Sequence, residues 1–158
     1  WGQKQERTPT WYGLFLADGS ETETIDVMHY VWNGAWPDNR APQIGSMRLD
    51  AKTSGENVVL LARAPSRASI IAQDPDGDRL EYRWEIMRES AADQVGGDKE
   101  QIPAVVAGAI GASQDGSVEL VAPTDAGAYR LFAYVYDGEG HAGHANIPFL
   151  VNQAGSAR

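Results

Sequence analysis

Apolar and polar residues alternate along most of the chain that follows residue 39. The alternation is clearest over residues 80–86, 129–136 and 145–151, where every second position carries an apolar or aromatic side chain. A period of two is typical of strands with one buried face. Shorter stretches compatible with strands occur at residues 44–49, 58–61, 68–72 and 118–122. With Gly, Pro and Asp turns between them, these segments predict an all-β sandwich of about seven strands.

The chain before residue 39 has a different pattern. Residues 11–16 are predicted to form a strand, and residues 18–19 (Asp-Gly) a turn. Ser20 and Glu23 have the spacing of a capping box, and apolar residues recur at helical spacing from residue 25 to residue 32. The sequence therefore predicts a strand, a turn and a helix. The aromatic residues of this part are Trp1, Trp11, Tyr12, Phe15, Tyr30, Trp32 and Trp36.

Two prolines within residues 37–42 favour extended backbone and indicate a linker between two parts of the chain. We therefore expect a strand–helix extension at residues 1–38, a sandwich at residues 39–152 and a tail at residues 153–158. Residues 89–116 are rich in Gly and Ala and have weak periodicity. We interpret them as a long insertion between strands rather than as a separate domain.

The chain of 158 residues carries a formal net charge of −9 and has no cysteine. An acidic chain repels the phosphate backbone, so we expect no nucleic-acid partner. The absence of cysteine excludes disulfides, thiolate metal sites and cysteine nucleophiles. The sequence has no basic block for an anionic membrane, no apolar run of about 20 residues and no visible signal peptide. It does not begin with Met, and we interpret it as a piece of a longer protein.

Three motifs resemble the immunoglobulin-like modules of the PKD and cadherin-like group. Residues 74–78 (Asp-Pro-Asp-Gly-Asp) precede a strand that contains Trp84. Residues 125–129 (Asp-Ala-Gly-Ala-Tyr) look like the tyrosine corner before the penultimate strand. Residues 134–140 (Tyr-Val-Tyr-Asp-Gly-Glu-Gly) look like the turn between the last two strands. The resemblance covers roughly residues 39–152 and implies an immunoglobulin-like sandwich.

Residues 1–13 (Trp-Gly-Gln-Lys-Gln-Glu-Arg-Thr-Pro-Thr-Trp-Tyr-Gly) are similar to the end of the barrel of a family-two-like (β/α)₈ glycoside hydrolase. This resemblance implies a parent enzyme that is secreted or periplasmic and acts on carbohydrate. It implies that the helix before the linker is the last helix of that barrel. The fragment itself is expected to be non-catalytic, because a barrel active site is assembled from the ends of several strands.

The acidic turn at residues 74–78 is a candidate Ca²⁺ site. Hard cations take several oxygen ligands, and carboxylates that crowd together without a cation repel each other. In a sandwich of this topology the turn lies at the same end as the loop before the last strand, near the linker. The alternative interpretation is an ordinary Asp-Gly hairpin turn. The candidate ligands are Asp74, Asp76, Asp78, Asp137 and Asn39.

An aromatic stripe is the first candidate site for a polysaccharide. If Tyr129 faces the core, Phe132, Tyr134 and Tyr136 face away from it, in line with Arg83 on the neighbouring strand. Flat aromatic rings beside polar groups suit sugars, which stack their apolar face and hydrogen-bond through their hydroxyls. The alternative is that another part of the chain covers the stripe.

Trp32 and Trp36 are further candidates for a carbohydrate platform, and their alternative role is to hold the first part of the chain to its neighbour. Trp84 lies mid-strand on the apolar face and is expected in the core. Glu6 is a lone carboxylate on the barrel-like strand, and glycosidases need a pair. No nucleophile elbow, phosphate loop or dinucleotide fingerprint is present.

Three functions remain open from the sequence. The first is a carbohydrate-binding accessory module of a glycoside hydrolase, with a polysaccharide as partner. The second is a structural spacer that packs on the catalytic barrel of its own parent chain. The third is a Ca²⁺-dependent protein-interaction module. We expect a monomer in each case.

Overall fold

The computed structural model describes the backbone of residues 4–6 and 8–12, and the full structure of residues 14–91 and 102–153. In these ranges the chain forms one helix, a two-stranded hairpin and eight strands in two further sheets. The elements are β1 (Lys4–Glu6), β2 (Thr8–Tyr12), α1 (Glu23–Asn33), β3 (Gln43–Leu49), β4 (Val58–Leu61), β5 (Pro65–Gln73), β6 (Glu81–Arg88), β7 (Ile110–Gln114), β8 (Ser117–Val121), β9 (Gly127–Tyr136) and β10 (Ala142–Asn152).

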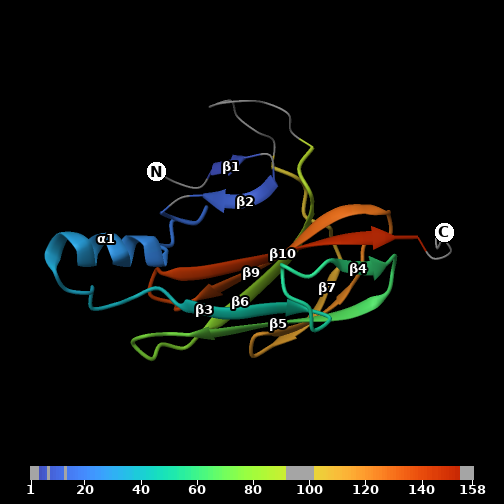
Figure 1. Ribbon diagram of the computed structural model, residues 1–158. Coiled ribbons are helices and arrows are strands. Elements are labelled where there is room, and N and C mark those ends of the chain that lie inside the picture. The colour runs from blue at the N-terminus through green and yellow to red at the C-terminus, as the bar shows by residue number, and fades with distance from the viewer. Residues whose placement is uncertain (1–3, 7, 13, 92–101, 154–158) are drawn as a thin grey trace.

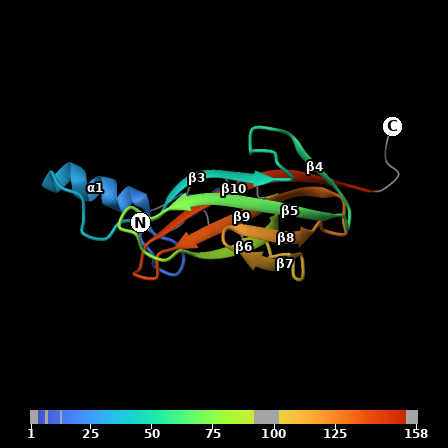
Figure 2. The same ribbon diagram turned by 90° about the horizontal axis from the view of Figure 1, so that it is seen from below.

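The two four-stranded sheets pack face to face, with strand orders β4-β10-β9-β6 and β3-β5-β8-β7 (Figures 1 and 2). β4 pairs parallel with β10, and the other strand pairs of both sheets are antiparallel. This arrangement confirms the predicted all-β sandwich. β7 is an additional strand, which lies within the segment interpreted as an insertion. Its residues are mostly small and exposed, so they lack the alternation that identifies a half-buried strand.

The core forms where the alternating apolar residues of the two sheets meet. Ile86, Leu131 and Ile147 are completely buried there, and Trp84 is partly buried and packs against the same core. The Tyr129 hydroxyl donates a hydrogen bond to the Asp125 carbonyl oxygen at 3.0 Å. This bond is the one expected of a tyrosine corner, so this motif was correctly predicted.

The first part of the chain contains the predicted helix, but its N-terminus was wrongly predicted. The N-cap is Thr22, whose side chain makes no capping hydrogen bond. Ser20 instead belongs to the preceding turn, where its N–H donates to Asp18 Oδ1. The helix ends at Gly34, which has φ 75° and donates its N–H to the Tyr30 carbonyl. A left-handed conformation of this kind favours glycine.

The predicted strand at residues 11–16 is displaced toward the N-terminus. β2 ends at Tyr12, and Phe15 makes only an isolated bridge with Glu21. The barrel-like motif falls largely outside the described side chains, and Trp1 and Gly13 lie outside the described residues altogether. The same holds for residues 92–101 of the predicted insertion and residues 154–158 of the tail.

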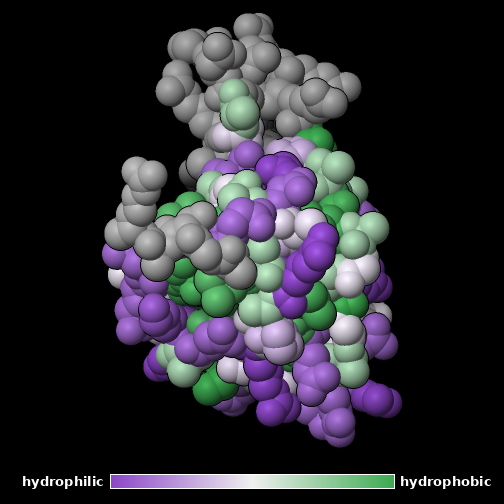
Figure 3. All heavy atoms as spheres, turned by 90° about the vertical axis from the view of Figure 1, so that its right-hand side faces the viewer, coloured by the Kyte–Doolittle hydropathy of each residue, from purple (hydrophilic) through white to green (hydrophobic). Residues whose placement is uncertain are grey.

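α1 projects from one end of the sandwich, and the β1–β2 hairpin lies on the outer side of the β4-β10-β9-β6 sheet (Figure 1). Residues between the hairpin and the helix join this sheet through a bridge between Glu21 and His141. At the opposite end of the molecule, apolar and polar residues are intermixed over the surface (Figure 3).

Candidate functional site

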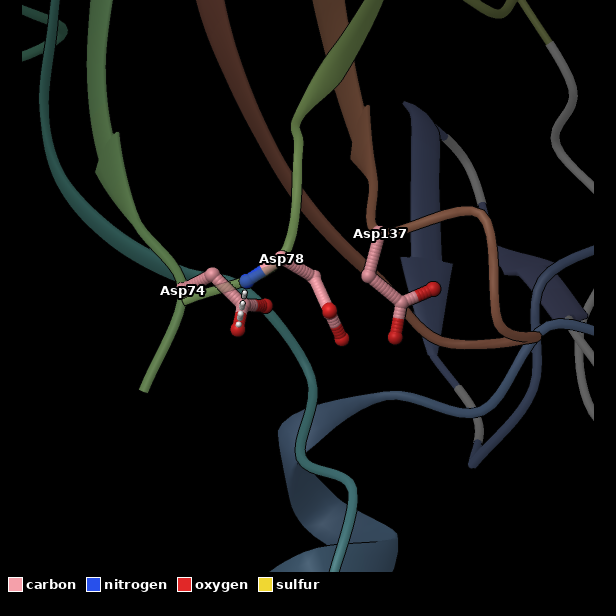
Figure 4. Close-up of side chains that lie close together, drawn as sticks. All are labelled: Asp74, Asp78 and Asp137. Atoms are coloured by element: carbon pink, nitrogen blue, oxygen red, sulfur yellow. Dashed lines mark hydrogen bonds between the residues drawn. The ribbon is translucent and has the colours of Figure 1, made fainter. Parts of the chain in front are cut away.

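Three loops meet beside α1: the linker, the turn after β5 and the turn between β9 and β10. Figure 4 shows Asp74 and Asp78 of the first turn beside Asp137 of the second. Each of the three offers a carboxylate oxygen, and these oxygens lie within 4.8 Å of one another. The two turns therefore lie at one end of the sandwich, as the sequence predicted.

Asp74 organises the first turn. Its Oδ1 accepts the N–H groups of Asp76, Gly77 and Asp78 at 2.9, 2.9 and 3.1 Å. Gly77 has φ 91°, a conformation that side chains other than glycine rarely adopt. The other oxygen of Asp74, Oδ2, is buried and has no hydrogen-bond partner. A buried carboxylate oxygen without a partner is costly, so this atom is a candidate ligand for a cation.

Asp137 organises the second turn and ties it to the linker. Its Oδ1 accepts the N–H groups of Glu139 and His141 at 2.8 and 3.0 Å, and its Oδ2 accepts Asn39 Nδ2 at 2.9 Å. Burial opposes ionisation of Asp137, but these hydrogen bonds lower its pKa below the ordinary aspartate value. Asp137 is therefore an ionised acceptor in the folded protein at neutral pH.

Asp78 is the carboxylate of the cluster whose pKa is raised. Desolvation, followed by the negative charges of Asp74 and Asp137, raises the pKa of Asp78. Three close carboxylates are a donor set for a hard cation such as Ca²⁺, which neutralises this repulsion. The other two predicted ligands lie differently. Asp76 Oδ2 accepts a hydrogen bond from the Arg40 N–H at 2.7 Å. Asn39 presents its amide nitrogen, and not its amide oxygen, to Asp137, where it donates a hydrogen bond.

Two residues of this end were not predicted as site residues from the sequence. Asp26 of α1 is completely buried, and its Oδ2 accepts the Ala41 N–H at 2.8 Å. Burial raises the pKa of Asp26. His141 contacts Asn39, and its ring nitrogens lie 3.3 Å from Asp137 and 3.5 Å from Glu21. Ala41 is 15 residues from Asp26, and Asn39 and Glu21 are about 100 or more residues from His141, so no local pattern indicates these contacts.

The aromatic residues of the first part adjoin this end. Tyr30 stacks on Trp36 with ring centroids 4.6 Å apart, and the Arg40 guanidinium lies over Trp36 at 4.1 Å. Trp36 is therefore held by its neighbours, while Trp32 is 73% exposed. Trp32 thus keeps an open ring face for a partner.

The stripe is only partly exposed: Phe132 is buried, which corrects its interpretation as a sugar platform, whereas Tyr134 and Tyr136 are half-buried. Phe132 is completely buried and stacks with Tyr134, whose hydroxyl donates to Glu85 at 2.7 Å. The Arg83 guanidinium lies over the Tyr136 ring at 4.4 Å. Burial and a hydrogen bond with Asp18 raise the pKa of Tyr136 to about 12.

His144, on the same outer face, has its pKa lowered by burial. Within the stripe, the Phe132 ring is thus unavailable to a stacking ligand.

No family model and no curated protein matches this chain. Among solved structures, a nucleoside hydrolase-related hypothetical protein from Saccharophagus degradans, described as associated with carbohydrate metabolism, is 19% identical with a TM-score of 0.42. That match covers 73% of this chain but 26% of the other chain. The copper resistance protein PcoC from Escherichia coli is 17% identical (TM-score 0.38), with coverage of 71% and 99%. Murine CRIg is 15% identical (TM-score 0.38), with coverage of 72% and 98%. At these values the similarities assign neither a family nor an activity.

Within the described part of the chain, no helix combines the length and hydropathy needed to cross a bilayer.

Proposed function

We propose that the chain is a non-catalytic accessory module of an exported carbohydrate-active enzyme. In this role the sandwich holds α1 in a fixed position for packing against the catalytic barrel of the parent chain. The observation that carries the proposal is the orientation of α1. Its single buried residue is Asp26, whereas Val27, Val31 and Trp32 are 43%, 70% and 73% exposed.

An amphipathic helix normally turns its apolar stripe toward the protein and its polar side toward water. α1 has the reverse orientation with respect to the sandwich, because Asp26 faces the linker while Val27, Val31 and Trp32 are exposed. Apolar groups that gather on an exposed helix face indicate an interaction surface. The barrel-like sequence directly before α1 supports the parent's own barrel as the body that covers it.

The linker holds α1 by several contacts. Asp26 accepts the Ala41 N–H, Asp76 accepts the Arg40 N–H, and Arg40 lies over Trp36. These contacts join the helix, the linker and the acidic turn into one unit. A fixed helix loses little conformational entropy when it packs against a partner, which favours a docking role.

The docking role is tested with Val31→Ser and Trp32→Ser, made both in this chain alone and in the full-length parent protein. In this chain the substitutions are expected to leave the thermal midpoint nearly unchanged, because both side chains are exposed. In the parent they are expected to lower it, since burial of a side chain such as valine is worth about 1.5–3 kcal/mol.

The matched control for this test is Leu61→Ser, at a site with 54% exposure on β4. This substitution is expected to leave the thermal midpoint of both proteins unchanged. Equal midpoints for the wild-type parent and its Val31→Ser and Trp32→Ser variants would refute the docking role.

We further propose that Ca²⁺ binds at Asp74, Asp78 and Asp137 and stiffens the junction with the linker. The unpartnered, buried Oδ2 of Asp74 and the raised pKa of Asp78 support this site. Ca²⁺ in the millimolar range is expected to raise the thermal midpoint, and EGTA to lower it, since a ligand that binds only the folded state stabilises it. Asp78→Asn should abolish the difference. A midpoint that responds to neither Ca²⁺ nor EGTA would exclude the site.

Polysaccharide binding by Trp32 is a second candidate function, because this ring is the most exposed of the described tryptophans and suits stacking. Affinity electrophoresis in gels with β-glucan, xylan, mannan or agarose tests it. Retardation that disappears in Trp32→Ala is the expected result, and unretarded migration in every gel would rule it out. Either function is consistent with the secreted or periplasmic location that we propose for the parent.

A further inference from the structure

A shallow trough lies on the outer face of the β3-β5-β8-β7 sheet. Figure 2 looks toward this sheet, on the side of the sandwich opposite to the β1–β2 hairpin. The trough consists of two adjoining hollows of about 550 and 320 Å³, and Arg67 and Glu119 line both of them. The larger hollow has the volume of a typical small-ligand site.

Small residues in and before β7 create the hollow. Gly108, Ala109 and Gly111 form one wall of the larger hollow, opposite Asp50 and Pro65. A Cβ at position 111 would lie 3.1 Å from the Glu119 carbonyl oxygen, so a side chain there would press on the β8 backbone that lines the trough. The pairing of β7 with β8 also shifts register between Ile110 and Ser113, which widens the surface locally.

The lining combines hydrogen-bonding groups with apolar patches. Arg67 and Glu119 face each other across the β5–β8 pair and offer donors and acceptors side by side. Apolar contact is provided by Pro65 and Val121. The smaller hollow is lined by Ser113, Gln114, Asp115 and Ser117 among others.

Charge restricts the class of ligand. The two hollows contain three carboxylates and one guanidinium, from Asp50, Asp115, Glu119 and Arg67. This excess of negative charge repels anionic ligands and leaves a surface that suits hydroxyl groups. The hollows extend along the five residues of β8, or about 16 Å at the rise of a strand, so the trough fits an extended chain rather than a compact molecule.

We propose that this trough binds a segment of a neutral oligosaccharide, with Arg67 and Glu119 as its central hydrogen-bonding pair. The site is separate from the docking face of α1. It lies on the sheet face that the hairpin leaves free, whereas Phe132 of the aromatic stripe on the other sheet is buried. Because the described residues that line the trough include no aromatic ring, binding depends on hydrogen bonds and is expected to be weak.

The test is affinity electrophoresis of this chain in xylan, mannan and β-glucan, with polygalacturonate as the anionic comparison. At least one neutral polymer is expected to retard the chain, and polygalacturonate is not. Arg67→Ala and Glu119→Gln should each weaken binding about tenfold or more, as expected for a hydrogen bond to a charged group. Gly111→Ala should weaken it by filling the trough, and circular dichroism checks that each variant is folded.

Leu61→Ser and Asp125→Asn serve as controls that should bind like the wild type, because both side chains are exposed and neither lines the trough. The proposal is overturned if no neutral polymer retards the chain, or if polygalacturonate does so equally. It is also overturned if Trp32→Ala abolishes retardation while Arg67→Ala and Glu119→Gln do not. None of these results bears on the docking role, which is measured by the thermal midpoint of the parent protein.

Discussion

Replacing Asp137 with alanine tests whether the acidic end is a structural junction. The side chain accepts hydrogen bonds from Asn39 Nδ2 and from the N–H groups of Glu139 and His141. Each such bond contributes a net stabilisation of about 0.5–1.5 kcal/mol, so their sum is about 1.5–4.5 kcal/mol. The substitution also removes a negative charge that raises the pKa of Asp78, and this relief offsets part of the loss. We therefore expect a destabilisation near the lower end, about 2 kcal/mol.

Urea denaturation followed by circular dichroism measures this change as a lower midpoint with an unchanged slope. Asp125→Ala is the matched control, because it removes an aspartate whose ion pair with Arg88 lies at the surface. The two side chains are 71% and 51% exposed, and such pairs contribute at most about 1 kcal/mol. If Asp137→Ala lowers the free energy of unfolding by less than about 0.5 kcal/mol, or by no more than the control does, the acidic end is not a structural junction.

Three further predictions concern the same molecule. Phe132→Ala should cost about 3–5 kcal/mol if the stripe is covered, and a loss below about 1 kcal/mol in chemical denaturation would mean that the ring is exposed. Tyr129→Phe should cost about 1 kcal/mol by the same assay through loss of the bond to Asp125, and a neutral result would contradict that bond. In an NMR titration Asp137 should titrate below the ordinary aspartate pKa and Asp26 above it. The stabilisation of the folded state by Asp137 is present above the pKa of the unfolded state and is lost as the pH falls through the lowered pKa of the folded state. Asp26 has the opposite effect: its protonated form favours folding, and this stabilisation is lost as the pH rises through its raised pKa in the folded state. Titration of Asp26 at or below the ordinary value would contradict its burial.

Local pattern determined much of the sandwich. The alternation in β6, β9 and β10 identifies both the strands and the faces they bury, because successive side chains on a strand point to opposite sides. Turn chemistry placed Asp74 and Asp137 in turns, and the topology of an immunoglobulin-like sandwich then placed these turns at one end. Strand β7 was not predicted, because its small, exposed residues do not alternate between apolar and polar.

The tertiary structure alone decided which faces are covered. Periodicity identified Phe132 as facing away from the core, yet it did not show that this side chain is buried on the outer face. The same limit applies to α1, whose helical spacing was evident while the inward direction of Asp26 was not. The physical reason is that a period fixes the relative directions of side chains within one element, whereas burial depends on contacts between segments distant in sequence. Asp26 with Ala41, and Asn39 with Asp137, are such contacts.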